Sequence, residues 1–519
     1  MMKVLSKLLS IVLVIALIGG VLIVRSTGKA ASNVPKNFVK VTYLMLGDPP
    51  TNGQLEKVSA EWNKVLKKKV NANLELKFTG WADWYTKYNM ILASGEPIDL
   101  ITSADDWLDL WPNAARGAFK PLDDLLPKYA PITWKSVPQS HWKLCKYNGK
   151  IIAIPEDQFT QWVNHGFFYR GDWARQAGIK LPIKDFETIE KYLDWIKKNK
   201  PGVIPWDAAV SIGQEIWDGW VESHTDAIGL PFGTGYHRIF WGKSAKDWAT
   251  VYSPIFDNTM IEYAKMMKRW SDKGFFRKDV LTYKGDTRSA LKEGKTGLDE
   301  HHTQTYLGLR VDMDKKQPGS DLQFFPWCYT RGNLVRLSIL HGATCVGRNS
   351  KNPDRALMVY DLIRNDPQVY RLVNYGIEGV QYILKKKNGV LVRATPPNYD
   401  ENKHAFWSNF WGGRNDKLEI PTENTPIEIR NQLWGYFNKI AKDFPYTGWA
   451  FEPKPIQAEL AALSNITNTY GPAISFGKVK DPVKAVEEYR NKLKAAGYDK
   501  ALKEVQKQLL KFKQQMENQ

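Results

Sequence analysis

The chain has 519 residues, of which 43% are hydrophobic and 25% are charged, and its mean hydropathy is -0.43. This composition excludes a disordered or low-complexity chain, and the length is sufficient for two hydrophobic cores. The formal net charge of +18 favours anionic partners, but the Lys residues are spread along the chain without a nucleic-acid motif. We therefore expect no nucleic-acid partner.

The first thirty residues indicate export. Lys3 and Lys7 precede a run of uncharged residues over 8–24, and Gly28-Lys29-Ala30 offers a cleavage site. Residues 1–30 are therefore predicted to be a signal peptide, or an N-terminal anchor, because the run is close to the length of a membrane span. No Cys follows it for lipid attachment. We expect the rest of the chain to be extracytoplasmic, either secreted or membrane-associated at the outer face of the cytoplasmic membrane.

The first part of the remaining chain alternates between predicted strands and helices. Alternating and periodic apolar residues predict five elements: a strand over 38–46, a helix over 52–69, a strand over 73–78, a helix over 82–94 and a strand over 97–102. This order is typical of a parallel sheet with helices on both faces. In such sheets, ligands bind beyond the carboxyl ends of the strands.

Further elements follow along the chain. Strand-like runs cover residues 150–154, 161–170 and 334–346. Helical periodicity is found over 186–198, 258–273, 353–363, 425–443, 455–469 and 482–514, the last interrupted at Ala496-Gly497.

Several motifs, in this order, carry a family resemblance. PIDLITSADDW, NGKIIAIPE, FFYRGDWARQAGI, GKTGLDEHHTQTY and SKNPDRALMVYDLIRNDPQVYRLVNYGIEGVQY resemble the extracellular solute-binding proteins (family 1 type) of carbohydrate ABC importers. The C-terminal PIQAELAALSNITNTYGPAISFGKVKDP looks like the large lipoprotein-like branch found in Gram-positive bacteria. The resemblance covers nearly the whole chain after the leader.

The resemblance implies an α/β, two-lobed periplasmic-binding-protein type II fold. Each lobe would be a mixed sheet flanked by helices, with hinge strands between the lobes. Lobe one would comprise residues 36–152 and 336–390, and lobe two residues 156–333 and 391–519 with the C-terminal helices. The crossovers would lie at 151–155 and near 334–336.

The predicted strand ends carry residues suited to a sugar. A pyranose needs an aromatic plane for its C–H face and carboxylates or amides for its hydroxyls, and the chain is rich in aromatic residues, with 21 Trp. The candidates at these strand ends are Asp48, Trp81, Asp83, Asp105, Asp106 and Trp107. Two alternatives stay open: Trp107 could pack with Trp111, and Asp105 and Asp106 could be helix N-caps.

The resemblance adds candidates further along the chain. The segment from Glu300 to Tyr306 would carry an aromatic platform, either His302 or Tyr306, and Trp411 would be another platform. Glu156, just after the first crossover, and Trp162 would lie near the mouth of the cleft. We expect Trp107, Tyr306 and Trp411 to share one groove.

The sequence predicts no metal site. Cys145, Cys328 and Cys345 lack metal-ligand spacing, and Cys328 and Cys345 could pair or remain buried thiols. Glu300, His301 and His302 are adjacent on a predicted strand, so their side chains alternate between its faces and cannot readily bind one ion.

Three classes of function compete. The favoured hypothesis is a monomeric binding protein without cofactor or catalytic residues, which delivers an oligosaccharide to the membrane permease subunits of an ABC importer. The main alternative is a secreted carbohydrate-active enzyme, a hydrolase or lyase, although we find no GxSxG, P-loop or HExxH motif. An adhesion or cell-wall protein is the third possibility. The positive charge favours acidic oligosaccharides and the Trp content favours neutral ones, so the sequence leaves the sugar open.

Overall fold

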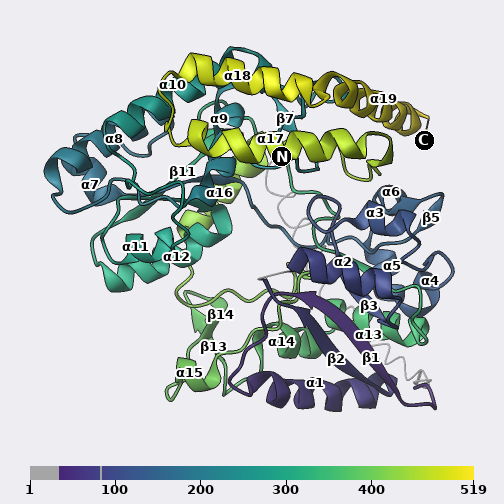
Figure 1. Ribbon diagram of the computed structural model, residues 1–519. Coiled ribbons are helices and arrows are strands. Elements are labelled where there is room, and N and C mark those ends of the chain that lie inside the picture. Colours follow the sequence, from purple (N-terminus) through teal and green to yellow (C-terminus); the bar gives the residue numbers. More distant parts are fainter. Residues whose placement is uncertain (1–33, 82–83, 519) are drawn as a thin grey trace, which may run out of the picture.

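The computed structural model describes residues 34–81 and 84–518, so the predicted leader lies outside the described residues. Two large hydrophobic cores divide the chain into two lobes, the first lobe below and the second lobe above in Figure 1. The core of the first lobe takes its residues from 41–154, 340–373 and Phe410, and that of the second lobe from 167–327 and 446–512.

The first lobe is built on a four-stranded mixed sheet with the strand order β12-β3-β1-β2. Its strands are β1 (Val39–Leu46), β2 (Ala72–Thr79), β3 (Leu100–Ser103) and β12 (Ala343–Val346). β1 pairs in parallel with β2 and β3, whereas β12 returns from far along the chain and pairs antiparallel with β3. The sheet is enclosed by α1 (Gln54–Val70), α2 (Trp84–Ser94), α13 (Pro353–Asn365) and α14 (Pro367–Tyr375).

The second lobe has β6 (His165–Arg170) at the centre of a three-stranded sheet, between β10 (Leu298–His302) and β11 (Leu322–Pro326). Both neighbours are antiparallel to β6. A small sheet of β7 (Ile228–Gly229), β8 (Trp241–Gly242) and β9 (Val251–Tyr252) lies in the same lobe. The main helices are α8 (Phe186–Asn199), α9 (Gly213–His224), α10 (Asn258–Asp272) and α12 (Thr303–Lys316).

The C-terminal helices complete the second lobe. α17 (Gln457–Ser475), α18 (Pro482–Ala495) and α19 (Tyr498–Glu517) lie along its outer side, as the yellow helices at the top of Figure 1 show. Asp481 caps α18 by accepting hydrogen bonds from the backbone N–H groups of Val483 and Lys484. Gly497, with φ at 95°, makes the predicted break between α18 and α19.

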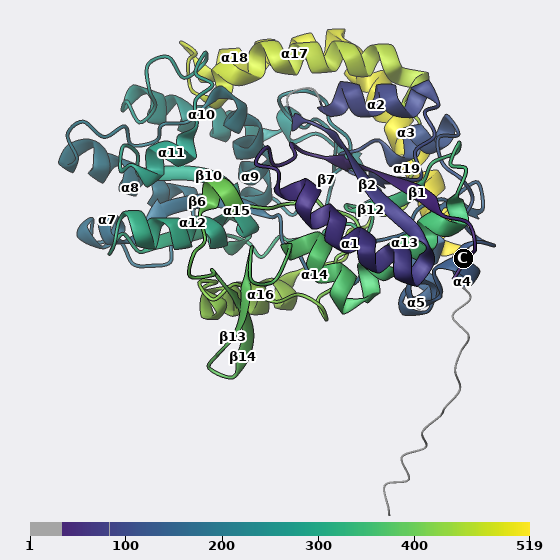
Figure 2. The same ribbon diagram turned by 90° about the horizontal axis from the view of Figure 1, so that it is seen from below.

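Shorter elements fill the connections. They are α3 (Leu110–Ala115), α4 (Leu126–Tyr129), α5 (Pro131–Ser136), α6 (Gln139–Leu144), β4 (Lys146–Tyr147), β5 (Lys150–Ile151), α7 (Gly171–Gln176), α11 (Thr287–Lys292) and α15 (Glu401–His404). The longer helix α16 (Ile427–Ile440) lies between α15 and α17 in the chain. The hairpin of β13 (Ile383–Lys387) and β14 (Val390–Ala394) extends from the first lobe, as Figure 2 shows.

The last change of lobe comes later than the sequence predicted. The sequence predicts lobe two for residues 391–519, but β14 pairs with β13 in one hairpin, so the two strands belong to the same lobe. Phe410 packs in the core of the first lobe, and Ile420 packs against Tyr370 and Tyr375 at the end of the same lobe. The chain therefore returns to the second lobe only after Ile420.

The three cysteines are free and buried. Cys345 lies in the core of the first lobe, whereas Cys328 lies in a separate cluster with Tyr306 and Phe437. The possible pairing of Cys328 with Cys345 is therefore wrong.

Candidate functional site

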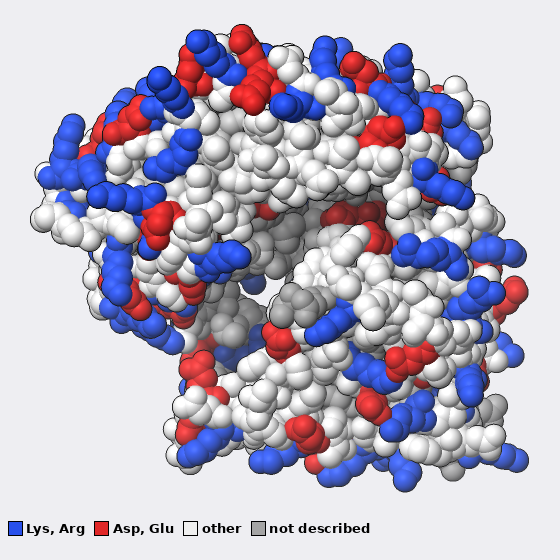
Figure 3. Space-filling view, in the orientation of Figure 1, with Lys and Arg blue, Asp and Glu red and all other residues white. Residues whose placement is uncertain are grey.

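A cavity of about 470 Å³ lies between the lobes. From the first lobe, Tyr85 and the residues around Asp106 and Trp107 line it. From the second lobe, Phe232 and Phe451 line it, and their rings are stacked with centroids 4.3 Å apart. Figure 3 shows the hollow between the two lobes.

A second cavity, of about 300 Å³, adjoins the first, since Asp106 and Pro231 line both. Its walls come mainly from the second lobe and from the segment 333–338 that connects the lobes. We refer to the two cavities together as the interlobe groove. Its lining includes both aromatic rings and carboxylates, which is the combination that a sugar requires.

The loop after β3 is held in place by the connecting segment. The N–H of Asp105 donates to the Leu340 carbonyl at 3.2 Å, and the Ser338 hydroxyl donates to Asp105 Oδ2 at 2.8 Å. Asp106 Oδ2 lies 2.7 Å from His341 Nδ1, and Trp107 Nε1 donates to the His341 carbonyl at 2.9 Å. Residues 338–341 lead from the connection between the lobes into β12. The loop after β3 is therefore hydrogen-bonded to a segment that connects the two lobes.

Of the two alternatives for this loop, the helix N-cap does not apply, whereas Trp107 does pack on the core cluster that contains Trp111. Helix α3 begins at Leu110 with Asp109 as its N-cap residue, so neither Asp105 nor Asp106 caps it. The indole of Trp107 contacts that of Trp84, with ring centroids 5.6 Å apart, and lies at the groove. Burial, followed by the neighbouring Asp106 carboxylate, raises the pKa of Asp105 to about 7.

One helix contributes three carboxylates to the second cavity. Glu215, Asp218 and Glu222 of α9 lie three and four residues apart, which places them on one face of the helix. Arg238 donates from Nε to Asp218 Oδ2 at 2.9 Å. Trp217 and Trp220, on the same helix, are buried in the second lobe.

A histidine–carboxylate pair lies at the edge of this cavity. His165 Nδ1 is 2.6 Å from Glu300 Oε1 on the neighbouring strand. Burial lowers the pKa of His165, but the carboxylates of Glu300 and Glu215 outweigh it and raise this pKa to about 9. Glu300 is itself buried behind His165, so His165 lines the cavity and Glu300 orients it.

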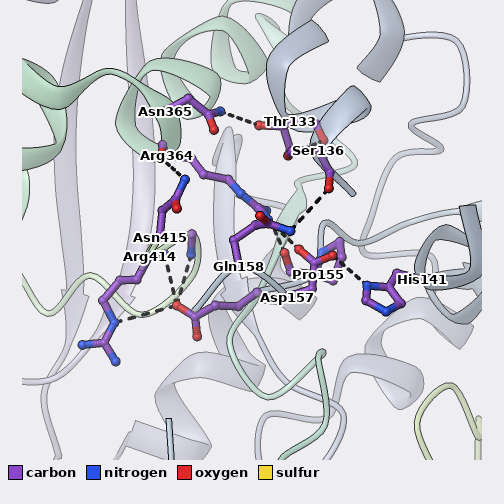
Figure 4. Close-up of polar contacts among 12 residues, drawn as sticks. Thr133, Ser136, His141, Pro155, Asp157, Gln158, Arg364, Asn365, Arg414 and Asn415 are labelled. Carbon is purple, nitrogen blue, oxygen red and sulfur yellow. Dashed lines mark hydrogen bonds and ion pairs between the residues drawn. The ribbon is translucent and has the colours of Figure 1, made fainter. Parts of the chain in front are cut away.

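The first crossover is anchored by a buried ion pair, drawn in Figure 4. Arg364 Nη2 lies 2.6 Å from Asp157 Oδ1, and Arg364 Nη1 donates to the Pro155 carbonyl at 2.7 Å. His141 Nδ1 lies 2.7 Å from the other Asp157 oxygen. The preceding residue, Glu156, accepts from the backbone N–H of Arg414 at 3.2 Å. Burial raises the pKa of Glu156 to about 7.

The structure brings together only part of the predicted site. Asp105, Asp106 and Trp107 line the groove, and Trp162 lines its second cavity. Glu300 is buried behind His165, and Glu156 is buried at the first crossover, where it accepts from the backbone of Arg414. Asp83 lies outside the described residues.

The remaining candidates lie elsewhere. Tyr306 is in a core cluster, where it stacks on Phe324, and His302 caps α12. Trp411 packs against the core of the first lobe, and its Nε1 donates to the Leu46 carbonyl. The expectation that Trp107, Tyr306 and Trp411 share one groove is therefore wrong, because Tyr306 points its ring into a core.

Asp48 and Trp81 are exposed near one end of the first-lobe sheet. The Asp48 carbonyl accepts hydrogen bonds from Trp407 Nε1 and Asn409 Nδ2. The exposed Trp407 therefore lies beside this strand end, and neither Asp48 nor Trp81 lines the two cavities described above.

Sequence reasoning missed the second-lobe wall of the groove. Phe232, Trp449 and Phe451 lie in loops without periodicity, so only the fold brings them opposite Trp107. The three carboxylates of α9 do carry a signal, since their spacing marks one helical face. Among the described residues, no cluster of His, Cys, Asp and Glu has the arrangement of a metal site.

Comparison with known proteins identifies the family. A model described as bacterial extracellular solute-binding protein matches residues 52–363, and one described as a domain of unknown function matches 445–514. A carbohydrate ABC transporter substrate-binding protein of Streptococcus pneumoniae is 28% identical over 491 residues, covering 93% of this chain and 92% of that protein.

Solved structures share the fold. The N-glycan transport solute-binding protein NgtS of Streptococcus pneumoniae superimposes with a TM-score of 0.71 at 23% identity, covering 92% of this chain and 99% of NgtS. The alginate-binding protein AlgQ2 gives a TM-score of 0.63 at 20% identity, with 92% and 99% covered. These likenesses confirm the predicted α/β solute-binding fold, and the family model covers more than half of the sequence. The chain therefore belongs to the bacterial extracellular solute-binding proteins, which bind solutes and are not enzymes.

Proposed function

We propose that this solute-binding protein captures an oligosaccharide in the interlobe groove and delivers it to the permease subunits of an ABC importer. The observation that carries the proposal is the composition of the groove, where Trp107 and Asp106 of the first lobe face Phe232 and Phe451 of the second. The Streptococcus pneumoniae relative is named as a carbohydrate transporter component, and NgtS has been crystallised with Man1GlcNAc and Man5GlcNAc. Both names support a sugar ligand.

In this proposal, rings provide stacking planes and acids accept hydrogen bonds. Trp107 and Phe451 offer apolar faces from opposite lobes, whereas Asp105 and Asp106 offer carboxylate oxygens. Asp105 Oδ1 and Asp106 Oδ1 are buried and have no hydrogen-bond partner among the described residues. Buried oxygens of this kind gain most from a new donor, such as a sugar hydroxyl.

We propose that the lobes close on the ligand by rotation about their connections. The connections are the segment after Ile154, the segment 334–341 and the chain after Ile420. A ligand that contacts both lobes favours the closed state because only that state provides all the contacts. The closed rims would then form the surface that the permease recognises.

The protein would act outside the cytoplasmic membrane, as its family does. No helix within residues 34–81 and 84–518 is long and apolar enough to cross a membrane. We propose that residues 1–30 direct export, either as a cleaved signal peptide or as a retained anchor. Edman sequencing or mass spectrometry of the N-terminus of the exported protein distinguishes the two.

A binding screen tests the proposed function. Thermal-shift measurements across neutral and acidic oligosaccharides identify a ligand, and calorimetry then measures its stoichiometry. We expect saturable binding of one oligosaccharide per protein, with the oligosaccharide recovered intact. Release of shorter sugars on prolonged incubation would instead favour a carbohydrate-active enzyme.

Small-angle scattering tests closure with the same ligand. We expect a smaller radius of gyration in the saturated protein than in the free protein, because the rotation brings the lobes together. An unchanged radius at saturation contradicts closure without contradicting binding.

A further inference from the structure

The interlobe groove has an excess of acids, although the chain as a whole is basic. Its two cavities are lined by six carboxylates: Asp105, Asp106, Asp109, Glu215, Asp218 and Glu222. The ionisable bases that line them are Arg238, Arg336 and His165. The formal net charge of +18 therefore does not describe the surface that a ligand meets.

Each of these bases already faces a carboxylate. Arg336 Nε lies 3.2 Å from Asp443, and His165 lies 2.6 Å from the buried Glu300. Arg238 Nε lies 2.9 Å from Asp218 Oδ2. Among the described residues that line the groove, every cationic side chain therefore has a carboxylate beside it. Several of the carboxylates have no matching base.

Asp218 of α9 is the most buried of these six carboxylates. Asp218 is only 8% exposed, and its Oδ1 has no hydrogen-bond partner among the described residues. Glu222, one turn further along the same face, lines the same cavity. Burial raises the pKa of Asp218 to about 6, and burial together with the Asp218 charge raises that of Glu222 to about 8.

Two indole groups in the same wall are also unsatisfied. Trp162 Nε1 and Trp327 Nε1 are buried donors without a hydrogen-bond partner in the described part of the chain. Unpaired donors and unpaired acceptors in one cavity suit hydroxyl groups, since a hydroxyl both donates and accepts. A carboxylate ligand could use only the donors, and it would face Asp218 and Glu222.

The outer surface has a different character. Figure 3 shows Lys and Arg side chains interspersed with Asp and Glu over the outside of both lobes, and a group of acidic side chains at the edge of the hollow. An anionic ligand can therefore be attracted to the protein from a distance and still be disfavoured in the groove. Charge repulsion is stronger where water is largely excluded, as between closed lobes.

We propose that the interlobe groove selects neutral oligosaccharides over those that carry carboxylates, and that Asp218 and Glu222 are specificity-determining residues. The proposal rests on the proposed function, since it names the class of sugar for the same groove. Discrimination arises from repulsion of the wrong ligand as well as attraction of the right one.

The test compares a matched pair of ligands by calorimetry. The probes are the tightest-binding neutral gluco-, xylo- or manno-oligosaccharide and a sugar of equal length bearing one uronate residue. The wild-type protein is compared with the Glu222→Gln variant, which keeps the shape of the side chain and removes its charge. The Glu262→Gln variant, on the exposed side of α10, is the matched control.

We expect the wild type to bind the neutral sugar at least tenfold more tightly than the uronate sugar at pH 9, where Glu222, with its pKa of about 8, is ionised. The Glu222→Gln variant should reduce this ratio at least threefold, mainly by improved uronate binding, and Glu262→Gln should leave it unchanged. Asp218→Asn is a second variant. This substitution weakens the ion pair between residue 218 and Arg238, so the thermal stability of the variant is measured as well.

Three results overturn the proposal. Equal or tighter binding of the uronate sugar refutes the selection and leaves the proposed function intact. A ratio that is unchanged in both the Glu222→Gln and Asp218→Asn variants refutes the role of α9. Binding of neither sugar class refutes the proposed function and this proposal together.

Discussion

At the scale of single residues, the Arg364–Asp157 pair has the largest expected effect on stability. Both side chains are fully buried, and the pair connects α13 to the first crossover. Burial raises the pKa of Asp157, but His141 and Arg364 outweigh it, so this pKa lies below its ordinary value. The ionised pair therefore stabilises the fold above the pKa of an unfolded Asp, and this stabilisation is lost as the pH falls through the lower folded value.

We predict that Arg364→Met lowers the free energy of unfolding by about 3–5 kcal/mol at pH 7, because it leaves Asp157 as a buried, unpaired charge. Urea unfolding measures the change. Lys64→Met removes an exposed pair with Glu61 and should cost less than about 1 kcal/mol. Similar costs for the two variants would contradict the role given to burial.

Glu222 gives a pH-dependent prediction. Its folded pKa of about 8 lies above the ordinary value of 4.5 for a glutamate, so the folded state binds its proton more tightly than the unfolded state. The resulting stabilisation is present below about pH 4.5 and is lost as the pH rises towards about 8. The melting temperature should therefore fall between pH 5.5 and pH 8.5 in the wild type. In Glu222→Gln this fall should be smaller by a few degrees. Parallel curves for the two proteins would contradict the prediction.

At the scale of elements, two helical glycines differ in their surroundings. A Cβ added at Gly219 of α9 would lie 2.2 Å from Cδ2 of Trp327, whereas one added at Gly435 of α16 meets no described atom within 4 Å. The close approach of α9 to Trp327 therefore requires Gly219, and Gly435 has no such constraint.

We predict that Gly219→Ala destabilises the protein by about 1–3 kcal/mol because the added methyl group overpacks the site. Gly435→Ala should stabilise it by up to about 1 kcal/mol, because Ala has the higher helix propensity. Urea unfolding of both variants provides the measurement. A stabilising effect at both positions would show that Trp327 moves aside without cost.

Periodic elements could be predicted from the sequence, whereas irregular ones could not. The predicted helices over 186–198, 258–273 and 353–363 correspond to α8, α10 and α13 within two residues at each end. The strand-like run 334–346 forms a strand only over Ala343–Val346. The preceding residues turn at Ser338, whose hydroxyl donates to Asp105. Local periodicity cannot predict this contact because the two residues lie far apart in the chain.

At the scale of the whole molecule, the sequence predicts only the groove residues that follow from local pattern. Asp105, Asp106 and Trp107 could be predicted because ligand sites lie beyond strand ends in open α/β sheets. Phe232 and Phe451 could not, since their place opposite Trp107 depends on the packing of two lobes. Tyr306 was misassigned because an aromatic residue on a helix packs into a core as readily as it lines a cleft.

The central claim is that one oligosaccharide contacts both lobes, and calorimetry on one variant from each lobe tests it most directly. Trp107→Ala removes a ring from the first lobe and Phe451→Ala removes one from the second, with the exposed Phe38→Ala as the control. We predict that Trp107→Ala and Phe451→Ala each weaken binding of the screened oligosaccharide at least tenfold, whereas Phe38→Ala binds as the wild type does. Undiminished affinity in either groove variant would contradict capture between the lobes.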